Sequence, residues 1–520
     1  MLKNHSLTSI IFARRRRALQ RSVENPFDAQ NKILRYLLRK GRHTVFGRDH
    51  GFDNIKSYDD YRRLVPLRRY EDIKVYIERL LHGERNVLWP EKINYFSKSS
   101  GTTGSKSKYI PVSNSALNKC HYRGGRSLLA CYFAQNLNSN LLLGQNFALG
   151  GSKQADEIGD GKYIADVSVI LMKKLPWWAQ LRRSPRFSVA AMSEWEEKLS
   201  RISEIIAYQN IVSLSGVPSW NLALAKKILE ITGKSTLREV WPKLELFIHG
   251  GTSMAPYREQ FKSLVGADDM NYLEVYNASE GFFAFQDKLE RNDMLLFVDG
   301  GVFYEFLPME EINKPKPRAL GLDEVELNKN YALVISTNAG LWRYIIGDTI
   351  KFTSLKPFRI VITGRTKSFI NACGEELVVE NADEAVKEAC RQTESLVKEY
   401  MAAPLFGEGN EAVACHQWIF EFEKAPADLD AFGVYLDIEL RRRNSDYEAK
   451  RHKDMNLGTP RIIIARENLF YDWLKQKKRL GGQSKVPRLA NDREIIESLL
   501  SLNNERMSLE EKETSNVLAL

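Results

Sequence analysis

The chain has 520 residues, 43% of them hydrophobic, so it is long enough to bury a large core and to form more than one domain. Charged residues make up 27% and aromatic residues 10%, a composition that excludes a disordered protein. A net charge of +10 is mild over this length, and the body of the chain lacks basic clusters interleaved with aromatic residues, which argues against a general nucleic-acid-binding surface.

The cysteines and the apolar runs indicate where the protein works. The five cysteines have neither CxxC spacing nor nearby histidine pairs of the kind that bind zinc, and scattered reduced thiols are typical of cytosolic proteins. No apolar run follows the charges near the N-terminus, as it would in a secretory signal, and no stretch is long enough to span a bilayer. We expect a cytoplasmic monomer with no membrane partner and no nucleic-acid partner.

The first hundred residues are predicted to be mainly helical. The run "ARRRRALQR" at 13–21 is expected on a helix, as a solvated or phosphate-steering face rather than a nucleic-acid-binding arm. Asn25 can cap a second helix that has Pro26 at its first position and apolar residues at helical spacing after it. Acid-rich helical segments follow at 58–64 and 70–83.

Beyond Pro111 the pattern predicts an α/β fold. Helical segments alternate with short apolar runs at 210–216 and 244–251, and the region 295–352 has the texture of consecutive strands. After it, helix, strand, helix, strand and helix follow in turn, which is typical of a small α+β unit. The sequence therefore predicts a large N-terminal domain over residues 1–362, with β-sheets flanked by helices, and a smaller α+β domain over 363–520.

A segment rich in glycine and hydroxyl residues, "YFSKSSGTTGSKSKYIP" at 95–111, is too small and polar to build a core. It is not a Walker loop, because Gly101 and Gly104 have the wrong spacing for that motif. Its glycines still let backbone N–H groups approach an anion, and its serines and threonines add hydroxyl donors. Phosphate binding and a mobile surface loop explain this segment equally well when it is taken alone.

Two later stretches favour the phosphate interpretation. "EVYNASEGFFAFQ" at 274–286 reads as a buried strand that ends in a polar turn with Glu280, and "LWRYIIGDTIKF" at 341–352 places Asp348 after a strand and a glycine. Each acid alone is typical of a cap or a turn. Together with the hydroxyl-rich loop, they supply what a magnesium–nucleotide site needs: oxygen ligands for the metal, an acid for the ribose hydroxyls and donors for the phosphates.

These three stretches, in this order and at these separations, resemble the motifs of the Gretchen Hagen-three family of acyl-acid–amido synthetases, a branch of the adenylate-forming enzymes. "SSGTTG" with Lys108 and Pro111 is similar to the first motif, "YNASE" to the second and "YIIGD" to the third, and the resemblance covers almost the whole chain. General acyl-CoA ligases carry "TSGTTGxPKG", which is absent here. The third motif has Ile345 where plant members have arginine, with Arg343 two residues earlier, which resembles variation in bacterial branches.

The resemblance implies an ATP-dependent, AMP-forming ligase that takes ATP and Mg²⁺ as cofactors and joins a small carboxylic acid to an amine, expected to be an amino acid. Glu280 would hold magnesium and act in catalysis, and Asp348 would bind the ribose. Lys485 in "GGQSKVPR" resembles the mobile catalytic lysine, and Lys367 falls at the hinge. The resemblance also implies that the smaller domain is mobile and that the large domain includes a β-barrel-like part. The other ATP-binding residues implied are Ser99, Ser100, Gly101, Thr102, Thr103, Lys108, Tyr276, Asn277, Ala278, Ser279, Arg365 and Phe369.

Two other functions stay open at this point. One is a ligase of the same superfamily that makes a thioester, and the other is a non-catalytic nucleotide-binding scaffold on the same fold. The intact acids and lysine of the motifs argue against the scaffold. For the acyl substrate, Arg123 and Arg126 could pair with a carboxylate, and His249 could line the acyl pocket or simply lie in the core.

Overall fold

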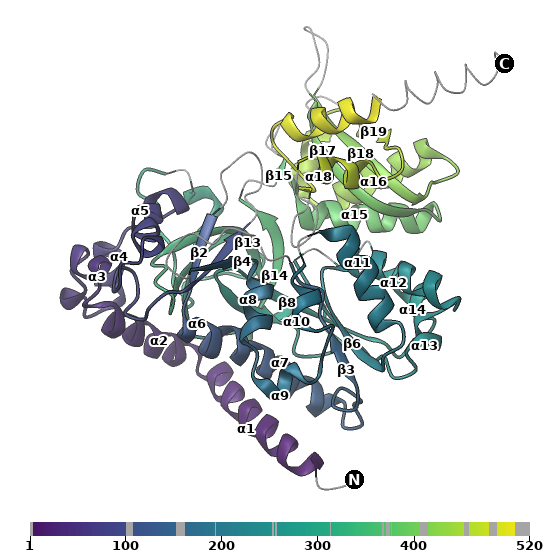
Figure 1. The fold of residues 1–520 in the computed structure, drawn as a ribbon. Coiled ribbons are helices and arrows are strands. Elements are labelled where there is room, and N and C mark those ends of the chain that lie inside the picture. Colours follow the sequence, from purple (N-terminus) through teal and green to yellow (C-terminus); the bar gives the residue numbers. More distant parts are fainter. Residues whose placement is uncertain are drawn as a thin grey trace, which may run out of the picture. The chain divides into compact units, whose positions relative to one another are not determined.

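The computed structural model shows two compact units (Figure 1). Among the residues it describes, the first unit ends at Ile362 and the second unit begins at Thr363. Met254 and residues 257–261 are the exception, because they group with the second unit. The described residues are 4–99, 108–151, 162–192, 194–251, 254, 257–312, 314–366, 369–370, 375, 377–405, 414–451, 457–477 and 486–504.

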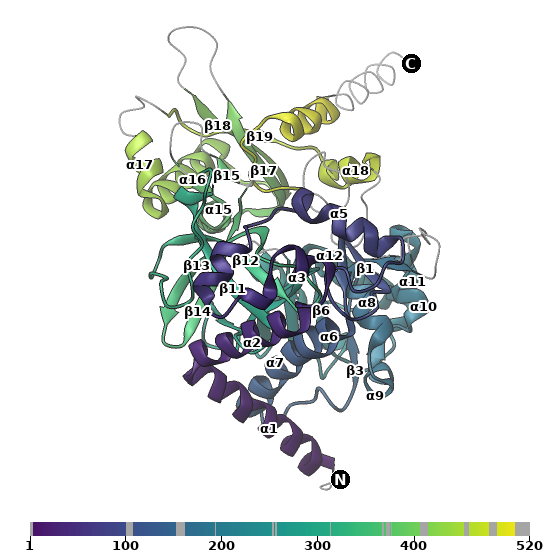
Figure 2. The ribbon, with the colours of Figure 1, turned by 90° about the vertical axis from the view of Figure 1, so that its left-hand side faces the viewer.

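Helices open the first unit, as the sequence predicts. They are α1 (Asn4–Glu24), α2 (Pro26–Gly41), α3 (Val45–Asp49), α4 (Tyr58–Leu64) and α5 (Tyr70–Leu81). The arginine run lies on α1, which packs along α7 (Figures 1 and 2). Buried Gln30 ties α2 to the main sheet, because its amide donates to the Val298 and Val302 carbonyls at 2.8 and 3.1 Å. None of the helices among the described residues is long and apolar enough to cross a membrane.

The main sheet has eleven strands among the described residues, in the order β11-β12-β13-β14-β10-β9-β8-β7-β6-β3-β5. Neighbouring strands from β5 to β8 are parallel. The pairs β8–β9, β9–β10, β10–β14, β11–β12 and β12–β13 are antiparallel. The strand-rich region predicted at 295–352 extends this same sheet. The strands are β3 (Gln145–Phe147), β5 (Arg183–Ser184), β6 (Ile211–Gly216), β7 (Leu246–Gly250), β8 (Asn271–Ala278), β9 (Gly281–Phe285), β10 (Met294–Leu296), β11 (Val302–Pro308), β12 (Asn330–Thr337), β13 (Tyr344–Leu355) and β14 (Phe358–Arg365).

Helices lie between these strands in the chain, which gives the alternation that the sequence indicates. α7 packs against β9, and α12 packs against β6. The helices are α6 (Asn114–Ala116), α7 (Tyr122–Gln135), α8 (Val167–Lys174), α9 (Trp177–Gln180), α10 (Phe187–Ala190), α11 (Trp195–Ile206), α12 (Pro218–Thr232), α13 (Leu237–Val240) and α14 (Arg258–Val265).

A separate three-stranded sheet carries the glycine-rich segment. β1 (Tyr95–Ser99) pairs antiparallel with β2 (Lys108–Val112) and parallel with β4 (Tyr163–Ala165). Ser99 lies opposite Lys108 at the end of the β1–β2 ladder, so the residues between them join the two strands of a hairpin. The glycine-rich segment, predicted to bind phosphate, therefore begins and ends on paired strand backbone, at Ser99 and Lys108.

The second unit is built on the sheet β17-β18-β19, with β17 antiparallel and β19 parallel to β18. Helices α15 and α16 bury Ala385, Val386, Phe432 and Leu436 in the same core as Trp418 and Phe420 of β18. The elements are β15 (Phe369–Ile370), β16 (Leu377–Val378), α15 (Val379–Gln392), β17 (Leu396–Leu405), β18 (Cys415–Lys424), α16 (Leu429–Arg443), α17 (Ser445–Arg451), β19 (Arg461–Ile464) and α18 (Leu469–Gln476). The predicted fold class, a large α/β part followed by a smaller α+β part, is confirmed; strand β17 is an element that the sequence analysis missed.

Candidate active site

The second and third motifs meet through a tyrosine and an aspartate of the first unit. Tyr276 on β8 donates its hydroxyl hydrogen bond to Oδ2 of Asp348 on β13 at 2.8 Å. The two strands stand four places apart in the sheet, which would be about 19 Å if the sheet were flat. A tyrosine side chain cannot reach that far. The sheet must therefore curl between β8 and β13.

The hairpin that carries the first motif meets the second motif through two buried serines. Ser97 on β1 donates to the hydroxyl of Ser279 at 2.9 Å. Ser279 directly follows β8 and stands beside Glu280, which occupies the half-buried turn between β8 and β9. The hairpin that holds the glycine-rich segment is thereby fixed against the "YNASE" turn. All three motif stretches converge within the first unit.

The loop hairpin is also held from its outer side. Tyr70 on α5 accepts a hydrogen bond from the backbone N–H of Tyr109 at 2.9 Å. The ammonium of Lys108 lies 5.6 Å from the centre of the Tyr70 ring, within range of a cation–π contact. Lys108 therefore stands at the end of the β1–β2 ladder with its charge over the Tyr70 ring.

A histidine that the sequence analysis missed supports the second motif. His121 ends a π-helical turn (Leu117–His121), a form that is frequent at functional sites. Its Nδ1 lies 2.9 Å from Oδ1 of Asn277, so the imidazole donates to the amide oxygen. Burial lowers the pKa of His121 to about 4, although the bond to Asn277 opposes the shift, so the ring is neutral at pH 7. In the sequence this residue is a lone histidine with no metal-type spacing, and only its position shortly after the loop hairpin could have drawn attention to it.

Asp348 is presented by an unusual stretch of backbone at the start of β13. Gly347 has φ +96, a left-handed conformation that glycine adopts without steric cost. Arg343 has φ +46, which is uncommon for any residue with a side chain. Such backbone persists where the surroundings hold it in place, and at Arg343 they do.

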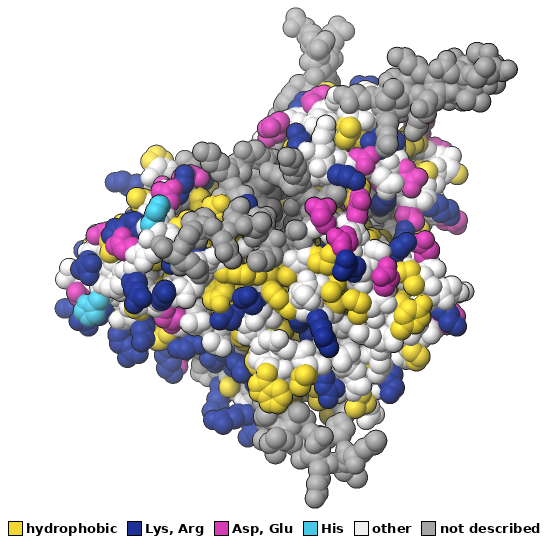
Figure 3. Space-filling view, in the orientation of Figure 1, with side chains coloured by type: hydrophobic (Ala, Val, Ile, Leu, Met, Phe, Trp, Pro, Cys, Tyr) yellow, Lys and Arg dark blue, Asp and Glu magenta, His cyan; other side chains and the backbone are white. Residues whose placement is uncertain are grey.

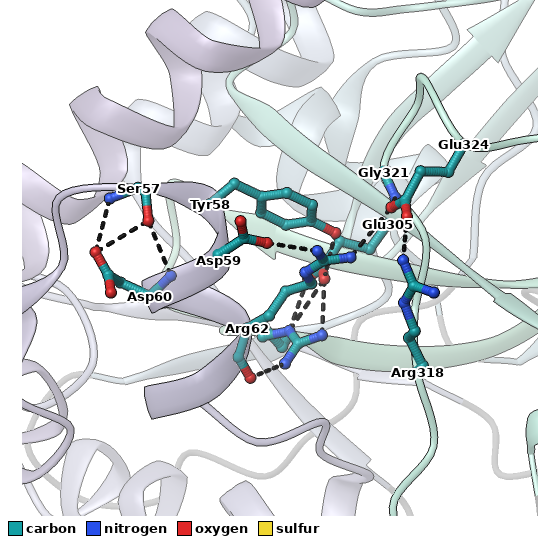
Figure 4. Close-up of polar contacts among 10 residues, drawn as sticks. Ser57, Tyr58, Asp59, Asp60, Arg62, Glu305, Arg318, Gly321 and Glu324 are labelled. Atoms are coloured by element: carbon teal, nitrogen blue, oxygen red, sulfur yellow. Dashed lines mark hydrogen bonds and ion pairs between the residues drawn. The ribbon is translucent and has the colours of Figure 1, made fainter.

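Arg343 does not replace the arginine that the third motif lacks. Its guanidinium is buried against Glu305 of β11, with hydrogen bonds of 2.8 to 3.1 Å to the carboxylate. It also donates to the carbonyls of Arg62 and Val65 at 2.9 and 2.7 Å. Glu305 also accepts a hydrogen bond from the hydroxyl of Tyr58 on α4 at 3.0 Å (Figure 4). Arg343 is therefore a positioning residue that joins the α4 segment to the strand carrying Asp348.

Arg123, which could pair with the carboxylate of an acid substrate, forms an ion pair within the first unit. Its Nη2 lies 2.6 Å from Asp299, which also pairs with Arg15 of α1 at 2.8 Å. The exposed Arg126 donates to the carbonyl of Tyr122 at 3.2 Å. His249 is buried on β7, which agrees with a core position. Arg123 shares Asp299 with Arg15 of α1, and its pairing with a substrate carboxylate stays a prediction.

The other predicted site residues divide into two groups. Ala278 ends β8, Arg365 ends β14, and Phe369 pairs with Val378 between β15 and β16. The backbone of Ser99 belongs to β1. The remaining predicted residues lie outside the described residues; they are Ser100, Gly101, Thr102, Thr103, Lys367 and Lys485.

The segment that follows Lys485 is anchored in the second unit. The backbone of Ala402 on β17 donates to the carbonyl of Arg488 at 2.9 Å and accepts from Ala490 at 3.1 Å. The guanidinium of Arg488 is buried 4.4 Å from the ring of Tyr400 and pairs with Glu399. The chain is therefore held only a few residues after the predicted catalytic lysine.

The donor set fits a nucleotide with magnesium. Mg²⁺ is usually bound by one or two carboxylates together with phosphate oxygens and water, so it needs no cage of acids. Glu280 offers one carboxylate in the turn after β8. Among the described residues there is no group of three or more histidines, cysteines and acids that could hold a metal ion.

Solved structures share this fold. A GH3.15 acyl acid amido synthetase in complex with 2,4-DB superposes with a TM-score of 0.76 at 17% identity, covering 94% of this chain and 96% of that one. A 2-hydroxyisobutyryl-CoA ligase in the postadenylation state superposes with a TM-score of 0.59 at 12% identity, covering 93% and 92%. The chain thus has the fold of ligases that form acyl adenylates.

The sequence itself identifies the family. Residues 15–270 match the GH3 family N-terminal domain, 295–365 the central domain and 380–494 the C-terminal domain. The chain belongs to the GH3 family. It is 22% identical to indole-3-acetic acid-amido synthetase GH3.3 of Arabidopsis thaliana over 93% of this chain and 92% of that protein. It is 23% identical to jasmonoyl–L-amino acid synthetase GH3.5 of Oryza sativa subsp. japonica over 89% and 92%.

Proposed function

We propose that this protein is an ATP-dependent, AMP-forming acyl-acid–amido synthetase that adenylates a carboxylic acid and transfers the acyl group to an amine, an amino acid. The observation that carries the proposal is the convergence of the three motifs, through Tyr276 with Asp348 and Ser97 with Ser279. The relatives named for indole-3-acetic acid and for jasmonoyl conjugates support this reaction class.

In the first half-reaction a carboxylate oxygen attacks the α-phosphorus of ATP, and the bond to pyrophosphate breaks. The hydroxyl and backbone donors of residues 99–103, with Lys108, are proposed to hold the phosphates and to offset the developing negative charge. Asp348 is proposed to accept hydrogen bonds from the ribose, in an orientation that the Tyr276 hydroxyl fixes. When bound, Mg²⁺ would neutralise phosphate charge, with Glu280 as its protein ligand.

In the second half-reaction the amine nitrogen attacks the acyl carbonyl carbon, the bond to AMP breaks, and the amine loses a proton. We propose that residues 363–520 form a mobile domain that turns about Lys367 between the two half-reactions. Lys485 would act only in the first, because adenylation gains from an added cation at the α-phosphate while amine attack needs an open path to the carbonyl. We also propose that the enzyme is cytoplasmic and monomeric.

The test is pyrophosphate release from ATP across a panel of carboxylic acids that includes indole-3-acetic and jasmonic acids, each with and without amino acids. A product that contains an amide supports the proposal. Coenzyme A in place of the amino acid tests the thioester alternative, and the absence of pyrophosphate release with every acid would favour the non-catalytic scaffold.

The role of Lys485 is tested by separating the half-reactions. Lys485→Ala should slow pyrophosphate release strongly and spare amide formation from a supplied acyl adenylate. Lys424→Ala removes the charge of an exposed lysine at the end of β18 in the same unit and serves as the matched control. Equal losses in both half-reactions would contradict the proposed role.

A further inference from the structure

A pocket of about 300 Å³ lies between α2 and the segment that leads into α4. None of its lining residues belongs to the three motifs. Its volume is at the lower end of the range for small-molecule sites. A small ligand with one or two rings is of a size that suits it.

The floor of the pocket is apolar and already formed. Leu34 of α2 and Phe52 are buried members of the core of the first unit, and Leu38 and Ile55 are half-buried beside them. The ring of Tyr58 adds a wall and is held by its hydrogen bond to Glu305 (Figure 4). A ligand with an apolar body can therefore lie on this floor without any rearrangement of the core.

The rim of the pocket is strongly basic. Arg35 and Arg39 stand at positions i and i+4 on one face of α2, and Arg42 directly follows the helix. Lys56 lines the pocket from the segment that leads into α4. Arg42 pairs with Asp53 at 3.2 Å, whereas the other three cations form no ion pair with any described residue. Lysine and arginine side chains gather over α2 on the surface (Figure 3).

Nearby acids do not cancel this charge, because they have partners of their own. Asp59 pairs with Arg62 at 2.5 Å, and Asp60 pairs with Arg63 at 2.7 Å and caps α4 through Ser57 (Figure 4). Like charges at i, i+4 destabilise a helix. The face of α2 that lines the pocket therefore carries a repulsion that a bound anion would relieve.

We propose that this pocket binds a small amphipathic anion, with its apolar body on the floor of Leu34 and Phe52 and a phosphate or carboxylate group held by Arg35 and Arg39. Guanidinium groups match the geometry of both anions through paired hydrogen bonds, which a flexible lysine rim would not. The site is separate from the proposed ATP site and does not depend on the proposed reaction.

The experiment is isothermal titration of the full chain with 1-naphthyl phosphate, which carries both parts of the ligand chemistry. Arg35→Gln with Arg39→Gln should weaken binding at least tenfold. The matched control, Arg17→Gln with Arg21→Gln, removes the same charge from exposed positions of α1 that do not line the pocket and should bind as the unchanged chain does. Inorganic phosphate should bind more weakly than the naphthyl ester, because it leaves the apolar floor empty.

Two sources of such an anion are distinguished by co-sedimentation with vesicles that contain phosphatidylserine. Sedimentation that is lost only in the Arg35/Arg39 variant identifies a lipid headgroup, and retained naphthyl phosphate binding without sedimentation identifies a soluble metabolite. The proposal is overturned if the Arg35/Arg39 variant binds naphthyl phosphate as the unchanged chain does. Equal weakening in both double variants would overturn it too, since net charge alone would then explain the binding. The circular dichroism spectrum and melting temperature establish that each variant is folded.

Discussion

Removing the charge of Glu305 should destabilise the first unit strongly. The Glu305 side chain is 1% exposed and that of Arg343 is 5% exposed, and the guanidinium donates to the carboxylate at 2.8 to 3.1 Å. Glu305→Gln keeps the volume but leaves the guanidinium buried without its counter-charge. Breaking one side of a buried pair costs about 3–5 kcal/mol, and the amide oxygen still accepts one hydrogen bond, so we expect a loss of about 3 kcal/mol.

The free energy of unfolding is measured from urea titrations that resolve the transition of the first unit. With a slope of about 3 kcal/mol per molar urea, the loss lowers the midpoint by about 1 M. Glu310→Gln is the matched control, because Glu310 pairs with Lys329 at 3.0 Å but is 57% exposed. An exposed pair of this kind contributes less than about 1 kcal/mol.

A double variant separates the charge from the packing. Glu305→Met with Arg343→Met should be more stable than Glu305→Gln, because an apolar pair leaves no buried charge without a partner. The reasoning is refuted if Glu305→Gln shifts the midpoint no more than Glu310→Gln does, or if the double variant is as unstable as the single one.

Three further predictions concern the candidate site and strand β8, which carries its second motif. Asp348→Ala should reduce kcat/KM for ATP about tenfold to a hundredfold. Tyr276→Phe should reduce it only about fivefold, because it loses one neutral donor worth about 1 kcal/mol. Steady-state kinetics with varied ATP measures both effects, and wild-type constants in both variants would contradict the ribose role. Burial raises the pKa of Glu274 to about 7, so the folded chain binds more protons than the unfolded chain between about pH 4.5 and 7, and stability falls as the pH rises through that window. Glu274→Gln should therefore gain stability over the unchanged chain from pH 5 to pH 8 in urea titrations, by at most about 3 kcal/mol, and a gap that does not grow with pH would be inconsistent. Burial lowers the pKa of His121 to about 4, so the unfolded chain takes up a proton first as the pH falls from about 6.5 to 4, and His121→Gln should flatten the loss of stability in that window; an unchanged pH profile would exclude the assignment.

Most elements of the fold could be predicted from short stretches of sequence. Pro26 at the first position of α2, the spacing of apolar residues and the turn residues between strands are local signals, and the observed elements follow them. Strand β17 was missed because Lys398 and Glu399 interrupt its apolar residues. These two charges meet their partners only in the folded chain, where Lys398 pairs with Glu421 at 2.7 Å and Glu399 pairs with buried Arg488.

By itself the sequence determined the family and predicted the chemistry of the candidate site, because hydroxyl, glycine and carboxylate groups at fixed spacing are visible within three short motifs. Only the tertiary structure decided how the motifs meet. The contact of Tyr276 with Asp348 requires a curled sheet, and that of Ser97 with Ser279 joins residues 182 positions apart. The role of Arg343 was decided in the same way, since Glu305 comes from another strand. Contacts of this kind depend on strand order and sheet curvature, which arise from packing over the whole unit and not from any one stretch of the chain.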